Sequence, residues 1–183
     1  MVKYIFLFFI FQIQASYSQI DYSYWPNKDR TKEFLVEDTV SKEKNNIKII
    51  AVYNKKKLLG FVRKIDTTTG CNSACLPIQY VAYYDSGGNY IKLQGDNLTK
   101  INHTPMSQED LTQLDLFILN PPAELVSVKN PLELTDALTG ATFKKFQPFV
   151  IKGGAYSTLR ILTYHVETQK HLKKILENIN EKN

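Results

Sequence analysis

Two pairs of β-rich segments, each pair joined by a tight turn, most limit what this chain can fold into. The first pair is Ile47 to Tyr53 with Leu58 to Lys64, and the second is Ile78 to Asp85 with Tyr90 to Gln94. Lys55-Lys56-Lys57 separates the segments of the first pair, and Ser86-Gly87-Gly88-Asn89 separates those of the second. Apolar, β-branched and aromatic runs on both sides of turn residues are typical of β-hairpins. The sequence therefore predicts an antiparallel sheet that contains both hairpins.

Helical patterns follow in the second half of the chain. Ser107 stands three residues before Asp110, as in a capping box, and apolar residues at helical spacing continue until Pro121-Pro122. A terminal helix is expected from Ala155 onward, either whole or broken near Thr168. Strands followed by helices indicate an α+β fold, an antiparallel sheet with helices packed on it. The length of 183 residues suggests a single domain.

The N-terminus has the anatomy of a secretory signal peptide. A short start with one lysine precedes the apolar run Tyr4 to Ile13, and small Ser residues follow at the positions required for cleavage after Ser18. The apolar run is shorter than the roughly 20 residues of a membrane-spanning helix. The interpretation is a cleaved signal, residues 1–18, and the alternative is a retained membrane anchor. The mature chain is expected outside the cytoplasm, in the periplasm or at the cell surface.

Residues 19–46 are expected to form an N-terminal lead-in, with a short helix around Lys32 to Lys42. Loss of residues 1–18 would lower the formal net charge from +5 to +4, because one lysine and no acid are removed. The basic residues are spread along the chain, apart from Lys55-Lys56-Lys57, which fits an exposed hairpin tip. Nucleic-acid binding requires a clustered basic face, so a nucleic-acid partner is not expected.

Cys71 and Cys75 are the two cysteines of the chain, spaced as CxxxC. In an exported protein such a pair predicts a structural disulfide that shapes a local turn. A redox-active dithiol is the alternative, although the spacing is not CxxC. A zinc site would need two further ligands, of which His103 could supply one, so no metal is expected.

The segment Leu134 to Thr142, with the sequence LTDALTGAT, carries the sharpest motif. It resembles the signature of the FMN-binding domain family, to which a subunit of the sodium-pumping quinone reductase belongs. The resemblance implies that FMN is attached covalently to Thr142 through a phosphodiester bond. It also implies a partner for maturation, an FMN transferase that uses FAD and a divalent metal. Residues 47–180 would then form the FMN-binding-like domain.

The residue types of the motif suit a phosphate. Gly140 and Ala141 let the backbone approach closely, and Thr139 can donate a hydrogen bond to a phosphate oxygen. Asp136 repels a phosphate, so its expected role is to cap a turn or to engage the transferase and its metal. The alternative is an ordinary helix cap, since Asp136 and Thr139 are both good capping residues.

Weaker similarity to the family extends over residues 58–166. It is carried by Leu59-Gly60-Phe61-Val62, by the strand–turn–strand Tyr83 to Tyr90, and by the run Gly153 to Leu159. The sequence departs from the family after Thr142, because Phe143 to Pro148 replaces the small hydroxyl residues and helix that many members have. Apolar walls for the flavin ring could come from Phe143, Phe146 and Tyr156, although the sequence favours a core position for each of them.

The sequence therefore predicts an electron carrier whose cofactor supplies the redox chemistry and whose protein supplies attachment and orientation. No catalytic base or triad lies near the motif, so an enzyme in its own right is not expected. The redox partners would be a membrane quinone- or cytochrome-linked donor and a periplasmic or surface acceptor. The alternative is an exported, disulfide-stapled binding or interaction domain of the same fold without flavin.

Overall fold

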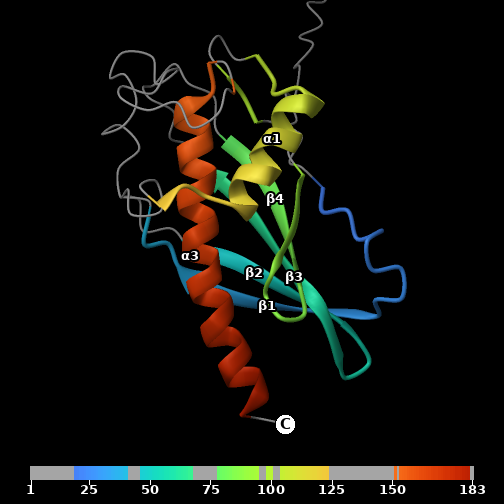
Figure 1. Ribbon diagram of the computed structural model, residues 1–183. Helices are drawn as coiled ribbons and strands as arrows, with labels where there is room; N and C mark the ends of the chain where they lie inside the picture. Colours follow the sequence, from blue (N-terminus) through green and yellow to red (C-terminus); the bar gives the residue numbers. More distant parts are fainter. Residues whose placement is uncertain are drawn as a thin grey trace, which may run out of the picture.

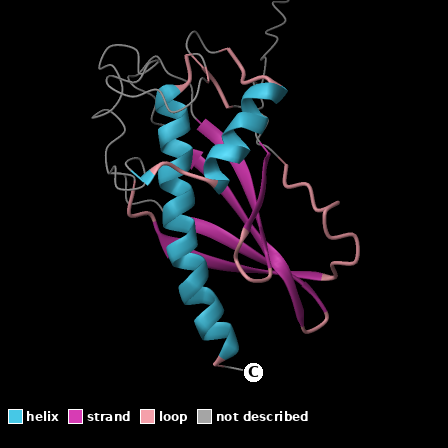
Figure 2. Cartoon of the chain, in the orientation of Figure 1, coloured by secondary structure: helices cyan, strands magenta, loops and turns pink. Residues whose placement is uncertain are grey.

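The computed structural model describes residues 19–40, 46–67, 78–94, 98–100, 104–123, 151 and 153–181. Its strands and helices, in chain order, are β1 (Arg30–Glu37), β2 (Asn46–Asn54), β3 (Lys57–Thr67), β4 (Ile78–Asp85), β5 (Tyr90–Gln94), α1 (Gln108–Leu119) and α3 (Ala155–Asn180). The strands form a five-stranded sheet in the order β1-β2-β3-β4-β5, and every neighbouring pair is antiparallel. The helix α3 crosses one face of the sheet, and α1 lies beside β5 (Figure 1, Figure 2). The predicted α+β fold is confirmed.

Both predicted hairpins are confirmed. Asn54 pairs with Lys57 at the end of the first, and Lys55 adopts a left-handed φ of 54° in the turn between them. In the second, the Asp85 carboxylate accepts hydrogen bonds from the backbone N–H groups of Gly87 and Asn89, both at 2.8 Å. The lysine run is exposed at the tip of the first hairpin, as its composition indicated.

The helix predicted around residues 32–42 is wrong where the structure describes it. Residues 30–37 form β1, which pairs with β2 in regular register from Arg30 opposite Tyr53 to Glu37 opposite Asn46. Phe34 and Val36 pack onto the core of the sheet from this strand. Mixed charges suggested a helix, but pairing and burial decide the conformation here because strand formation depends strongly on context. The lead-in is thus part of the sheet.

The terminal helix is continuous, without a break near Thr168. The Thr168 hydroxyl donates to the Tyr164 carbonyl at 2.6 Å and accepts a hydrogen bond from Arg63 of β3. A β-branched residue therefore sits inside the helix with its hydroxyl satisfied, and α3 runs from Ala155 to Asn180 without interruption.

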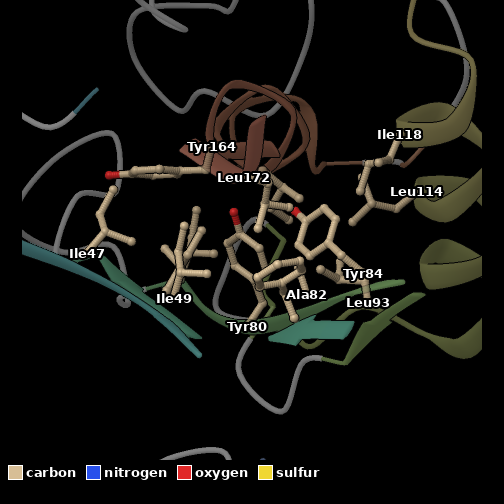
Figure 3. Close-up of a cluster of buried hydrophobic side chains, with 14 of the residues drawn as sticks. Ile47, Ile49, Tyr80, Ala82, Tyr84, Leu93, Leu114, Ile118, Tyr164 and Leu172 are labelled. Atoms are coloured by element: carbon tan, nitrogen blue, oxygen red, sulfur yellow. The ribbon is translucent and has the colours of Figure 1, made fainter. Parts of the chain in front are cut away.

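The two faces of the sheet are buried differently. The face under α3 carries the larger apolar cluster, and Figure 3 shows Tyr80 and Tyr84 rising from the sheet towards the helix and Tyr164. The opposite face carries a smaller cluster made of Trp25, Ile50, Val52, Val62, Val81 and Tyr83. The segment before β1 covers this face, with Trp25 packed at its centre and the Asp21 N–H donating to the Tyr83 hydroxyl at 3.0 Å.

Gly60 makes the approach of Trp25 to the sheet possible. A Cβ at this position would lie 2.5 Å from Trp25 Cζ2 and closer still to the backbone oxygen of Tyr84. We therefore expect Gly60→Ala to lower the free energy of unfolding by about 1–3 kcal/mol, because a strand or the Trp25 ring must shift. Urea unfolding followed by Trp25 fluorescence measures this. The matched variant Gly87→Ala, whose nearest neighbour would be at 3.3 Å, should cost less; equal losses would contradict the explanation.

Candidate functional site

The residues of the predicted flavin site lie outside the described part of the chain. They are Asp136, Thr139, Gly140, Ala141 and Thr142, together with the ring-wall candidates Phe143 and Phe146. The same holds for Cys71, Cys75, His103 and the predicted signal peptide 1–18. The described chain stops at Ala123 and starts again at Ile151, on the two sides of the motif in the sequence.

The first described helix after the motif, α3, begins at a pair of glycines. Gly153 has a left-handed φ of 72°, and Gly154 is the N-cap. Among the described residues, no side chain caps this end through a hydrogen bond, and its first turn holds no acidic residue. The first N–H groups of a helix and its dipole favour an anion at such an end. The electrostatics of the α3 start therefore suit a phosphate group.

The start of α1 provides a direct contrast. Ser107 and Asp110 form the predicted capping box, which is confirmed, and Glu109 adds a second acid to the first turn. Asp110 also accepts a hydrogen bond from Lys100 Nζ at 2.6 Å. Because Ser107 already binds the Asp110 N–H and two acids stand in the first turn, this helix end suits an anion less well.

Hydrogen bonds and close packing hold the start of α3 in place. The Gly154 N–H donates to the Ile151 carbonyl at 3.0 Å, and a Cβ on Gly154 would lie 2.6 Å from Ile151 Cγ2. Ser157 Oγ donates to the Thr99 carbonyl at 2.8 Å and so ties the helix to the segment before α1. Tyr156, the one ring-wall candidate that the structure describes, is half-buried in the same first turn.

A second polar cluster lies between α3 and the sheet. Arg63 of β3 is fully buried, and its Nη2 lies 2.9 Å from Glu167 Oε2, whose residue is only 3% exposed. Arg63 Nη1 donates to the Tyr164 carbonyl at 2.8 Å and to the Thr168 hydroxyl. Glu167 Oε1 in turn accepts the Thr39 N–H at 2.5 Å, which joins the chain after β1 to α3. This cluster connects three elements in the interior.

Two guanidinium groups flank the Tyr164 side chain in this cluster. The Cζ atoms of Arg63 and Arg160 lie 5.2 Å and 4.9 Å from the Tyr164 ring centroid, and Arg160 Nη2 donates to the Tyr164 hydroxyl at 2.9 Å. Burial raises the pKa of Tyr80 well above its ordinary value, and the positive charge of Arg63 opposes this. Among the described residues, the Tyr80 hydroxyl and Arg63 Nε have no hydrogen-bond partner. The cluster offers hydrogen-bond donors but no exposed surface.

His165 lies beside this cluster among aromatic rings. It stacks on Tyr84 with ring centroids 5.9 Å apart, its Nδ1 lies 3.3 Å from the Tyr84 hydroxyl, and Tyr90 meets it edge-on at 5.3 Å. Burial, assisted by the positive charge of Arg63, lowers the pKa of His165 to about 4. The imidazole is therefore neutral at pH 7. The described residues contain no group of three or more His, Cys, Asp or Glu side chains that could hold a metal ion.

The half-buried imidazole of His165 predicts a loss of stability in acid. Below about pH 6.5 the unfolded chain protonates His165, whereas the folded chain does so only near pH 4, so unfolding takes up a proton in this window. We expect stability to fall by roughly 2–3 kcal/mol between pH 7 and pH 4 from this residue. Urea unfolding across this pH range measures the slope.

His165→Gln is the control for this prediction, because it removes the titrating group and leaves the other ionisable residues in place. The difference between the two pH profiles isolates His165 from His171, whose pKa burial also lowers, and from Asp115, whose pKa burial raises. Profiles that run parallel would contradict the assignment.

Arg63, Glu167 and Thr168 were missed by the sequence interpretation, although the signal was present. Arg63 lies two residues from Phe61 and two from Ile65 on a strand, so all three side chains point to the same buried face. Glu167 and Thr168 follow Tyr164 by three and four residues, which places them on the same face of the helix. A charged residue at an inward strand position, with an acid at an inward helix position, predicts a buried ion pair.

No protein-family model, no curated protein and no solved structure matches the chain. The resemblance to the FMN-binding domain family therefore depends on the quoted residues alone. None of the helices within the described ranges has the length and the apolar character needed to cross a bilayer.

Proposed function

We propose that this chain is an exported electron carrier that holds FMN covalently through a phosphodiester bond to Thr142. The observation that carries the proposal is the segment Asp136 to Thr142, in which the acid, the hydroxyl residue, Gly140, Ala141 and the acceptor threonine all stand at the spacing of the family signature. The cofactor supplies the redox chemistry, and the protein supplies attachment, orientation and electrostatics.

The attachment reaction is a transfer of the FMN moiety from FAD. A bond forms between Thr142 Oγ and the phosphorus of the FMN phosphate, the pyrophosphate bond of FAD breaks, and AMP leaves. The hydroxyl proton passes to solvent. The FMN transferase and its divalent metal would perform this step, so the chain needs no catalytic base of its own. Asp136 would engage that enzyme or cap the turn that presents Thr142.

The start of α3 supports the proposal. A phosphodiester keeps one negative charge, which is stabilised near helix N–H groups that no described side chain caps. Gly154 stands twelve positions after Thr142 in the sequence, and the first turn of α3 contains no acid that would repel the group. Tyr156 in the same turn offers an aromatic side chain of the kind that can cover a flavin ring.

Covalent attachment suits a protein that works outside the cytoplasm, where a free cofactor would diffuse away. The apolar N-terminal run and the small residues near Ser18 support export to the periplasm or the cell surface. The redox partners proposed are a membrane quinone- or cytochrome-linked donor and a periplasmic or surface acceptor.

The deciding experiment is the intact mass of the protein purified from its own host. We expect the mass of the chain from residue 19 onward plus one FMN less one water, with flavin fluorescence that stays with the band on a denaturing gel. An unmodified, colourless chain in a cell with an active transferase would overturn the proposal. It would favour instead an exported binding domain stapled by Cys71 and Cys75.

A further inference from the structure

Positive charge gathers at one end of the sheet, where the turn between β2 and β3 projects in Figure 1. We call this the basic end, and its cations, all exposed or half-buried, are Lys28, Arg30, Lys55, Lys56 and Lys57. They come from residues 27–30, just before and at the start of β1, and from residues 54–57 of the turn. Five cations and one acid, Asp29, give these eight residues a charge of +4, compared with +5 for the whole chain.

Hydrogen bonds hold the two segments of the basic end together. Asn54 Nδ2 donates to the Asn27 carbonyl at 2.6 Å, and Arg30 Nε donates to the Lys55 carbonyl at 2.9 Å. The Lys55 N–H donates to Asp29 Oδ2 at 2.7 Å, so the acid of this end binds the backbone of the turn. The structure therefore joins two groups of cations that are far apart in the sequence, and the lysine run is part of a larger charged surface.

The turn carries lysine where its backbone favours another residue. Lys55 has a left-handed φ of 54°, a conformation that glycine and asparagine adopt at lower cost. Strained backbone of this kind is found most often at functional sites. A turn that served only to reverse the chain would be more stable with such a residue at position 55. The positive charge is thus kept at a cost to stability.

We propose that the basic end docks on a lipid bilayer that carries anionic headgroups. Its one arginine is engaged within the chain, because Arg30 Nε binds the Lys55 carbonyl and Arg30 Cζ lies 4.6 Å from the Tyr53 ring centroid. The other four cations are lysines, which act as point charges and lack the planar fork that reads bases and phosphates in nucleic acids. A cluster of such charges is attracted to an anionic membrane surface.

Tyrosines beside the cations favour lipid over an acidic protein. Lys28 Nζ lies 4.6 Å from the Tyr22 ring centroid, and Tyr24 in the same segment is 49% exposed. Tyrosine rings are enriched where a membrane meets water, because one end is apolar and the other is polar. Docking of this kind uses no flavin, so it is independent of attachment at Thr142.

Co-sedimentation of the purified exported chain with lipid vesicles measures the docking. We expect binding to phosphatidylcholine vesicles that contain about 30% phosphatidylglycerol, and at least tenfold weaker binding to phosphatidylcholine alone. The binding should be lost at about 0.5 M salt, because exposed charges are then screened. Equal binding to both kinds of vesicle, or binding to neither, would overturn the proposal.

Two triple variants with the same net charge locate the surface. Lys55→Gln/Lys56→Gln/Lys57→Gln should weaken binding at least tenfold, since each lysine near an anionic surface strengthens it about fivefold. The control Lys170→Gln/Lys173→Gln/Lys174→Gln removes three exposed lysines from α3 and should change binding less than about twofold. Equal losses in the two variants would show that net charge alone drives binding, which contradicts the proposal.

Lys55→Gly separates docking from folding. The substitution removes one charge and relieves the left-handed backbone, so we expect a higher urea midpoint together with weaker vesicle binding. A loss of binding that came from unfolding would lower both. Tighter binding of the wild-type chain to duplex DNA than to the anionic vesicles would identify nucleic acid as the partner and overturn the assignment to lipid.

Discussion

Thr142→Ala is expected to leave the chain without any covalent flavin, the largest effect among these predictions. The substitution removes the oxygen that would carry the phosphodiester, and alanine cannot replace it. Co-expression of the exported chain with an FMN transferase, followed by a denaturing gel and intact mass, measures the attachment. Wild-type protein should show one added FMN, and the variant should show none.

Two matched variants separate the acceptor from its surroundings. Thr142→Ser keeps a hydroxyl at the same position, so it should retain flavin. Thr139→Ala removes the neighbouring hydroxyl and leaves Thr142 in place, so flavin should remain attached. Attachment that persists in Thr142→Ala, or that disappears only in Thr139→Ala, would contradict the assignment of Thr142 as the acceptor.

The hairpins could be predicted because their signals are local. Turn residues and adjacent β-branched runs specify the pairing of β2 with β3 and of β4 with β5, without information from the rest of the chain. The same applies to the start of α1, where Ser107 and Asp110 satisfy each other within one turn.

β1 could not be predicted from its own residues. Its charged sequence has no strong local preference, and its conformation depends on pairing with β2 and on packing of Phe34 and Val36. Within α3, the Thr168 hydroxyl contacts both the Tyr164 carbonyl and Arg63 of the sheet. The error over β1 therefore concerns long-range contacts.

One part of the candidate site was identified from the sequence and another part from the structure. The acceptor motif can be identified only from Asp136 to Thr142, which lie outside the described residues. The uncapped start of α3 was visible only in the structure, since the run Gly153 to Leu159 does not by itself show that no described side chain caps the helix. The two observations are independent, and the proposed function uses both.

Glu167→Gln is expected to lower the free energy of unfolding by about 3–5 kcal/mol, because it leaves the Arg63 charge buried without its acid. The pair joins the centre of the sheet to the middle of α3, with Nη2 and Oε2 2.9 Å apart and both side chains almost fully buried. Glutamine can still accept the hydrogen bond from the Thr39 N–H, so the loss measures the charge rather than that contact. Urea unfolding at pH 7 is the measurement.

The chain contains a matched control for this variant. Lys48 and Glu33 form an ion pair at the same 2.9 Å distance, but their side chains are 49% and 54% exposed. Solvent screens an exposed pair, so Glu33→Gln should cost less than about 1 kcal/mol. A similar loss in Glu33→Gln and Glu167→Gln would show that burial does not decide the strength of the interaction.

The double variant Arg63→Met/Glu167→Gln separates the pair from its two charges. Each single substitution leaves one buried charge unpaired, whereas the double variant leaves none, so it should recover at least half of the summed single losses. Some loss remains because the Tyr164 carbonyl and the Thr168 hydroxyl no longer receive hydrogen bonds from Arg63. Strictly additive losses would mean that Arg63 and Glu167 each stabilise the fold independently of the other. Non-additivity would instead show that the pair acts as one unit between α3 and the sheet.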